Sequence, residues 1–234
     1  MTSFSSSEAR AVSMLATLYV VRMLGLFMVL PLIAIYSADL AGATPFLLGL
    51  AVGAYGLTQA SLQIPMGWLS DRVDRRVVII LGLAMLVLGS VVAALSTSIW
   101  GVVLGRFLQG AGAIASATMA LVADYTRAEQ RAKASAIIGG SIAIAFGIAL
   151  VLGPALAGFG GLQAVFAATA MLALLGMLVV AFLPKPQRFS REELSSGSGF
   201  QRSRLAQVLS IRSLNVMYLS IFFLHLTLMA VFVV

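Results

Sequence analysis

The 234-residue chain has no cysteine and very little charge. Without cysteine, disulfide bonds, thiolate metal sites and cysteine nucleophiles are excluded within these residues. Charged residues make up only 10% of the chain, whereas hydrophobic residues make up 61%, against roughly 45–50% in soluble domains. A soluble core of this size does not need so much apolar surface, so the composition favours lipid as the surroundings of most of the chain.

Long apolar runs separated by short polar segments fill the sequence. A helix of roughly 20 apolar residues spans a bilayer. The segments that meet this requirement, and that we predict as membrane spans, are 11–36, 45–68, 76–96, 98–123, 133–158, 161–184 and 213–234. Thr44-Pro45 and Ser96-Thr97-Ser98 are typical of helix starts. The first run is too long for a signal-peptide core and contains Arg22, which predicts a first helix that stays attached.

Basic residues occur on one side of this pattern only. Of the 15 Lys and Arg residues, Arg22 and Arg106 lie inside predicted helices, and the rest precede the first helix or fall between helices 2 and 3, 4 and 5, or 6 and 7. The alternate segments carry Asp39 and no Lys or Arg. The positive-inside rule therefore predicts a cytoplasmic N-terminus. Because topology accounts for the net charge of +7, we expect no nucleic-acid partner.

The spans are grouped unevenly along the chain. We predict an N-terminal six-helix transmembrane half over 1–184, a serine- and glycine-rich cytoplasmic linker over 185–212, and helix 7 over 213–234 as the start of a truncated C-terminal half. The chain stops inside an apolar run, which leads us to expect that the rest of that half is missing. Arg22 and Arg106 also head similar short runs in helices 1 and 4, as an inverted three-plus-three repeat would place them.

Two motifs resemble signatures of the major facilitator superfamily. The run from Gly67 to Arg76, GWLSDRVDRR, is similar to the family pattern Gly-x-Leu-x-Asp-Arg-x-Gly-Arg-Arg/Lys, with Asp74 where glycine is usual. Helix 4 contains Arg106-Phe107-Leu108-Gln109-Gly110-Ala111-Gly112, which resembles Arg-x-x-Gln-Gly-x-Gly. The resemblance implies an all-α polytopic membrane protein with two six-helix halves around a central cavity, of which this chain supplies the first half and helix 7.

Further runs resemble one branch of the family. Gly153-Pro154-Ala155-Leu156-Ala157-Gly158 is similar to the helix 5 motif of drug/proton antiporters, with Ala157 in place of one glycine, and we expect it to bend helix 5. The helix 1 run from Arg22 to Pro31 resembles the YajR-like branch of drug efflux proteins. These resemblances imply a multi-pass protein of the bacterial cytoplasmic (inner) membrane.

The resemblance also implies a gate at the cytoplasmic ends of the helices. The residues concerned are Gly67, Asp71, Arg72, Arg75, Arg76 and Asp124. Asp71 is expected to cap a helix of the other half, and Arg75 or Arg76 is expected to pair with Asp124. The alternative is an ordinary solvated loop whose ion pairs each contribute roughly 0–1 kcal/mol.

Other polar residues lie within the predicted spans. Arg106 with Gln109 is implied to serve proton coupling or substrate binding, although Arg106 could instead satisfy helix-end carbonyls. Arg22 could bind an anionic substrate group or contact backbone carbonyls. Tyr55, Gln59 and Gln63 share one face of helix 2, which could line the cavity or form interhelical hydrogen bonds. His225 in helix 7 could carry a proton or be a packed polar residue.

These residues favour a secondary transporter over other classes. We predict alternating access with proton-coupled efflux of amphipathic or drug-like small molecules, powered by the proton gradient with no cofactor and no metal. A uniporter or symporter of a specific metabolite, or a transport-inactive sensor of the same fold, remains the alternative. An enzyme is least favoured, because the sequence has no paired carboxylates, metal cluster or activated nucleophile in the spans.

Overall fold

The computed structural model describes residues 3–36, 40–184 and 210–233. The chain divides into two compact units, Met1–Glu192 and Glu193–Val234, which are described separately. In the described residues all regular secondary structure is helical, apart from one isolated β-bridge between Ala41 and Ser98. The prediction of an all-α polytopic protein is therefore confirmed.

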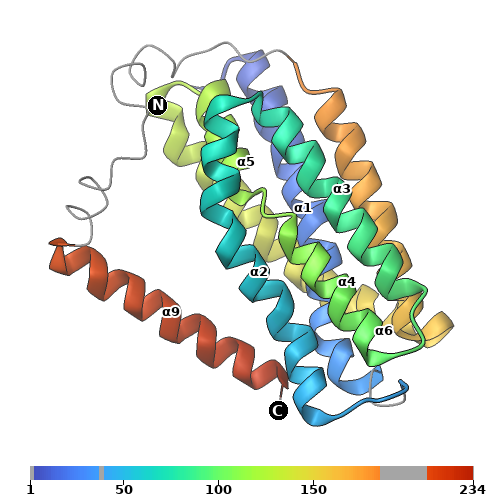
Figure 1. The fold of residues 1–234 in the computed structure, drawn as a ribbon. Helices are drawn as coiled ribbons and strands as arrows, with labels where there is room; N and C mark the ends of the chain where they lie inside the picture. The colour runs from blue at the N-terminus through green and yellow to red at the C-terminus, as the bar shows by residue number, and fades with distance from the viewer. Residues whose placement is uncertain (1–2, 37–39, 185–209, 234) are drawn as a thin grey trace. The chain divides into compact units, whose positions relative to one another are not determined.

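The first unit is a bundle of long helices (Figure 1). They are α1 Ser6–Tyr36, α2 Pro45–Arg72, α3 Arg75–Ala94, α4 Ile99–Ala111, α5 Ala115–Tyr125 and α6 Ala128–Ala181. The second unit contains α9, Arg212–Val233, which overlaps the predicted span at 213–234. The predicted linker at 185–212 lies almost wholly outside the described residues.

Local capping explains where several helices begin. Thr44 accepts a hydrogen bond from the Leu47 N–H, ahead of Pro45 at the first position of α2, and Ser98 accepts one from the Gly101 N–H at the start of α4. Both predicted helix starts are confirmed. Side-chain caps of this kind satisfy backbone donors that would otherwise lack a partner at a helix end.

The 54-residue helix α6 is two membrane crossings joined at a kink. A straight helix of that length would extend roughly 80 Å, far beyond a bilayer core of about 30 Å. Gly160 and Gly161 leave the helical conformation, and Gly161 has a φ of +63°, a left-handed value that glycine adopts readily. The arms 128–159 and 162–181 therefore correspond to the predicted helices 5 and 6.

The predicted span over 98–123 is present as one candidate crossing, Ile99–Tyr125, but its helix is not continuous. The structure interrupts it between α4 and α5 at residues 112–114, where Gly112 has a ψ of 46° (Figure 1). Gly112 packs directly against the backbone carbonyl of Gly82 in α3, a contact that leaves no room for a Cβ atom. The interruption is thus stabilised by tertiary packing, and apolar periodicity carries no signal for it.

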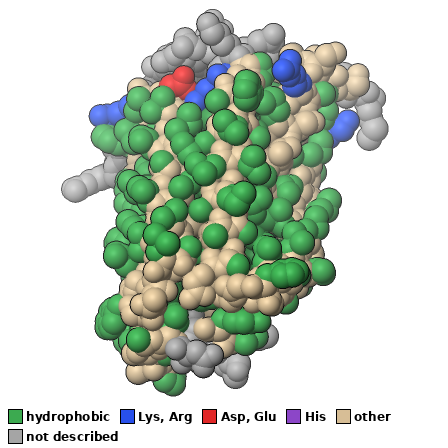
Figure 2. Space-filling model, turned by 90° about the vertical axis from the view of Figure 1, so that its right-hand side faces the viewer, with side chains coloured by type: hydrophobic (Ala, Val, Ile, Leu, Met, Phe, Trp, Pro, Cys, Tyr) green, Lys and Arg blue, Asp and Glu red, His purple; other side chains and the backbone are tan. Residues whose placement is uncertain are grey.

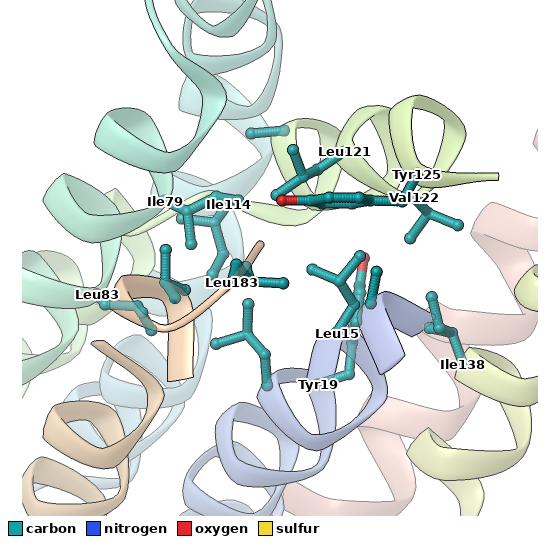
Figure 3. Close-up of a cluster of buried hydrophobic side chains, with 14 of the residues drawn as sticks. Leu15, Tyr19, Ile79, Leu83, Ile114, Leu121, Val122, Tyr125, Ile138 and Leu183 are labelled. Carbon is teal, nitrogen blue, oxygen red and sulfur yellow. The ribbon is translucent and has the colours of Figure 1, made fainter. Parts of the chain in front are cut away.

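Two clusters of buried apolar side chains hold the bundle together. In the bundle α1 packs against α6, α3 against both α4 and α6, and α2 against α4. One cluster draws its buried side chains from α1, α3, α5 and α6 (Figure 3), and includes Leu15, Tyr19, Ile79, Leu83, Ile114, Leu121, Val122, Tyr125 and Ile138. Interdigitated packing of this kind is a main source of helix association in lipid, since apolar tails compete equally for apolar surface.

The outer surface has the pattern of a membrane protein. On the face shown in Figure 2, hydrophobic side chains cover the length of the bundle, and the Lys, Arg, Asp and Glu side chains in view lie near one end. Large apolar side chains such as Leu81, Met171 and Phe159 are exposed. Five of the described helices are long and apolar enough to cross a membrane, counting α4 with α5 as one and α6 as one.

Candidate functional site

Arg106 is buried in α4 with 1% of its surface exposed. Its Nη1 donates to Oε1 of Gln109 at 2.9 Å, and its Nε donates to the carbonyl of Ala51 at 3.4 Å. The guanidinium carbon also lies 4.5 Å from the centre of the Tyr55 ring, a cation–π contact. Nη2 is buried with no hydrogen-bond partner among the described residues. These contacts fix the position of the Arg106 side chain, and its Nη2 can still donate hydrogen bonds to another group.

Gln109 connects this arginine to α3. Its Nε2 donates to the Ser90 hydroxyl at 2.7 Å, and the Ser90 hydroxyl donates to the Leu86 carbonyl at 2.6 Å. The chain of bonds is possible because α3 and α4 approach backbone to backbone: a Cβ added at Gly105 would lie 2.6 Å from the Gly89 carbonyl. Ser90 was not among the residues predicted from the sequence. Its signal is that it is the only polar side chain in the body of α3 after the two arginines that begin it.

Arg22 lies in the middle of α1 and is 4% exposed. Its Nη2 donates to the Gly112 carbonyl, at the interruption between α4 and α5, at 3.2 Å. Three residues earlier in α1, the Tyr19 hydroxyl donates to the Ala115 carbonyl at 3.3 Å. The predicted carbonyl contact of Arg22 is therefore present. Its Nη1 is buried and has no partner among the described residues.

The predicted polar face of α2 is only partly engaged. Tyr55 is buried under Arg106, whereas Gln59 and Gln63 are half-buried. The backbone carbonyl of Gln63 accepts a hydrogen bond from the Ser116 hydroxyl of α5 at 3.3 Å. Neither glutamine side chain forms a hydrogen bond within the described part of the chain. This contact uses the backbone of Gln63, so the predicted interhelical hydrogen bonds of the Gln59 and Gln63 side chains are not found among the described residues.

Arg75 lies at the end of the bundle where α2 ends and α3 begins, and it pairs with two carboxylates there. Its Nη1 lies 2.5 Å from Oδ2 of Asp124, and its Nη2 lies 3.5 Å from Oδ1 of Asp71. Nη1 also donates to the Ala120 carbonyl at 2.7 Å. The predicted pair with Asp124 is confirmed for Arg75. Asp124 is 19% exposed and Asp71 is 62% exposed, so Asp71 retains free oxygen lone pairs.

Arg76 has a different partner set. Its Nη2 donates to the Tyr125 hydroxyl at 2.7 Å and to the Pro184 carbonyl, and Tyr125 also donates to that carbonyl. The last arginine of the motif therefore joins the start of α3 to the segment that follows α6. Pro184 is the last residue described before the linker.

The departure at Asp74 is accommodated by the local backbone. Asp74 has φ −59° and ψ 124°, so this turn needs no left-handed residue, and its carboxylate accepts from the Arg76 N–H at 2.9 Å as the N-cap of α3. Gly67 lies close to α5, because an added Cβ would be 3.1 Å from the Ser116 hydroxyl. The Arg72 guanidinium stacks on the Trp68 ring at 3.7 Å.

Another charged contact, between Glu8 and Arg127, was not predicted from the sequence. Glu8, 3% exposed, accepts from the backbone N–H and Nε of Arg127, each at 3.0 Å, and from Nη2 at 3.0 Å. These bonds raise the pKa of Arg127 above its usual value. Glu8 also forms a capping box with Ser5. The Ser-x-x-Glu spacing was the available signal for this helix start.

The remaining predicted residues are placed as follows. Gly153 packs against α1, where an added Cβ would be 3.0 Å from the Met28 carbonyl. Gly153, Pro154 and Gly158 keep helical backbone angles, and the departures in α6 occur at Gly160 and Gly161 instead. His225 belongs to α9, but its side chain lies outside the described residues. The described residues contain no group of three or more His, Cys, Asp or Glu that could hold a metal ion.

Comparison with known proteins places the sequence in a family. Residues 15–234 match the family model described as Major Facilitator Superfamily. The chain is 48% identical over 227 residues to the inner membrane transport protein YajR of Escherichia coli K12, covering 97% of this chain and 49% of YajR. It is 32% identical over 157 residues to the class B tetracycline resistance protein of E. coli, covering 65% of this chain and 38% of that protein.

Solved structures show the same fold. A bacterial homologue of the human lysosomal transporter Spinster, in an inward-facing and unoccupied conformation, aligns with a TM-score of 0.66 at 19% identity, covering 80% of this chain and 45% of that one. The chain thus spans about half the length of the relatives it matches.

Proposed function

The chain belongs to the major facilitator superfamily of transporters, and from this premise we propose that it forms the N-terminal half of a secondary transporter that works by alternating access. In such proteins two halves move against each other around a site near the middle of the bilayer, so that the site opens to one side at a time. We place the N-terminus in the cytoplasm, because all basic residues of the sequence other than Arg22 and Arg106 fall on that side of the predicted spans.

The surface of this half supports a second half packed against it. Seven glycines have nothing within 4 Å of an added Cβ, and all lie on α2 or the first arm of α6: Gly49, Gly53, Gly56, Gly139, Gly140, Gly147 and Gly158. Small residues at membrane helix surfaces let another helix approach closely. We therefore infer that α2 and this arm face the C-terminal half, with the other helices toward lipid or the cavity.

The observation that carries the proposal is the setting of Arg106. A guanidinium cannot lose its proton under ordinary conditions, and a charge at this depth is costly unless it faces a cavity or a partner. Arg106 takes part in none of the ion pairs found among the described residues. Bonds to Gln109 and Ala51 fix its position while Nη2 stays unoccupied. An arginine held in this way suits a group that binds substrate or lowers the pKa of a carboxyl brought near it.

The cytoplasmic network supports the gate. Arg75 bridges Asp71 and Asp124, which joins the ends of α2, α3 and α5 within this half. Asp71 is held on one side only and remains mostly exposed, so it can accept from donors at the N-terminus of a helix in the other half. In our proposal this contact closes the inner side and breaks when the halves rotate.

For coupling and substrate we propose proton-driven efflux of amphipathic or drug-like molecules. The support is the relationship to proteins named for tetracycline resistance. The sequence has no acidic residue in the middle of the six spans of this half, so the titrating carboxyl would come from the rest of the protein. A uniporter or symporter of one metabolite is the second candidate. The observation that favours it is Ala157, which replaces a glycine of the antiporter motif in helix 5.

The experiment is drug accumulation in cells that lack their major efflux pumps and express the full-length protein, with and without a protonophore. We expect lower accumulation that the protonophore abolishes. Arg106→Ala should remove the effect and Arg106→Lys should retain little of it, since one ammonium cannot bond Gln109 and Ala51 in the same geometry. Arg10→Gln, which changes an exposed basic residue, is the matched control.

Two outcomes would contradict the proposal. Accumulation that never changes across a broad panel, at normal protein levels, would argue against drug efflux and favour a specific metabolite or a sensor. Efflux that survives Arg106→Ala would show that the buried arginine is structural.

A further inference from the structure

The interruption in the fourth membrane crossing creates a helix N-terminus in the middle of the bilayer. α5 runs from Ala115 to Tyr125, and no side chain caps it at Ile114. Its first turn begins with the bond from the Thr118 N–H to the Ile114 carbonyl. The N–H groups of residues 115–117 therefore have the unpaired donors and the partial positive charge of a helix start.

Arg22 reaches this interruption from α1. One nitrogen of its guanidinium bonds the Gly112 carbonyl, and the adjacent Nη1 is buried without a partner among the described residues. The bond from Tyr19 to Ala115 fixes the same face of α1 along the interruption. The carbonyl of Gly112, at the negative end of α4, offsets part of the Arg22 charge. Nη1 and the start of α5 remain as positive groups at the same depth.

No carboxylate balances this charge within the described residues. The ion pairs found there involve Glu8, Asp71 and Asp124, all near the cytoplasmic ends of helices. A buried cation without a counter-charge is strongly unfavourable in low dielectric, so such a group normally meets an anion. Interrupted helices in transporters characteristically present a half-helix N-terminus to an anionic substrate group.

We propose that Arg22 Nη1 and the N-terminus of α5 form a subsite for an oxyanion, a carboxylate, sulfonate or phosphate group carried on an amphipathic molecule. Ala115 and Ser116 are half-buried, and Ser116 contacts the backbone of Gln63, so the subsite adjoins the polar face of α2. As a statement about substrate class the inference rests on the proposed function. As a statement about binding it stands apart from transport.

The test is binding to purified full-length protein in detergent, without a proton gradient. The probes are naphthalene-2-sulfonate and naphthalene-2-sulfonamide, which share an apolar body and differ in charge. Charge-assisted hydrogen bonds lead us to expect that the wild type binds the sulfonate about tenfold more tightly than the sulfonamide. Arg22→Gln should erase that preference and Arg22→Lys should keep part of it. Arg10→Gln, an exposed position on the same helix, should keep all of it.

A second variant tests the helix terminus separately and guards against misfolding of the Arg22 variants. Ala115→Asp places a carboxylate at the start of α5, where an acidic residue favours the helix and competes for the subsite. It should abolish the sulfonate preference, whereas the neutral, isosteric Ala115→Asn should retain it. Monodisperse elution of each variant establishes folding.

Equal binding of both probes by the wild type would overturn the inference, and so would a sulfonate preference that survives Arg22→Gln or Ala115→Asp. Arg22 would then serve only to brace the interrupted helix. A charge preference in a protein that transports nothing would instead leave the subsite standing and refute the proposed function.

Discussion

The contact between α3 and α4 gives the sharpest test of the structure, through the substitution Gly89→Ala. An added Cβ at Gly89 would overlap the Gly105 carbonyl and lie 2.6 Å from the Gln109 backbone nitrogen. Both are backbone atoms, so no rotamer change can relieve the overlap. The two helices would have to separate, and that movement would displace Gln109, which orients Arg106.

The magnitude follows from two opposing effects. Overpacking of a well-packed site costs about 1–3 kcal/mol. Replacing glycine by alanine inside a helix recovers up to about 1 kcal/mol. We therefore expect a net loss of about 1–2 kcal/mol, equivalent to a fall in melting temperature of about 2–8 °C for a unit of this size.

The assay is thermal unfolding of the full-length protein in detergent, followed by the loss of monodisperse material, together with efflux at matched protein levels. Gly49→Ala is the control, because nothing lies within 4 Å of its added Cβ. Gly89→Ala should lower both stability and efflux, and Gly49→Ala should lower neither. A Gly89→Ala variant as stable and active as the wild type would refute the close approach of α3 and α4.

Three further predictions concern the other contacts. Asp74→Ala should destabilise the protein by about 0.5–2 kcal/mol through loss of the α3 cap, whereas Asp74→Gly should cost only a few tenths; equal melting temperatures for the two variants would exclude the cap. Arg76→Gln should loosen Pro184 and increase proteolysis of the linker that follows it, while Arg72→Gln should not; unchanged cleavage in both would refute the anchoring role. Gly53→Leu fits within this half, so a loss of efflux without loss of membrane insertion is expected if the second half packs there; unaffected efflux would place that interface elsewhere.

Much of the architecture follows from local rules in the sequence. The apolar runs and Thr44, Pro45 and Ser98 marked where membrane helices begin, and the structure agrees. The motif around Arg75 predicted an ion pair between one of its arginines and Asp124. The structure contains this pair, because Arg75 at the start of α3 lies beside the end of α5. The interruption after Gly112 was not predicted, since it depends on contact with Gly82 of a helix about thirty positions earlier.

The sequence by itself determined that the chain lies in a membrane, how many times its first unit crosses, and which charges are too deep to be accidental. Hydropathy and charge act residue by residue, so they can be read without knowing neighbours in space. Only the tertiary structure decided what those charges meet: Arg106 a glutamine and an aromatic ring, Arg22 the carbonyl of an interrupted helix. Gln109 lies one turn along the same helix as Arg106, but the other partners come from other helices, which close contacts at glycine bring together without a periodic pattern in the sequence.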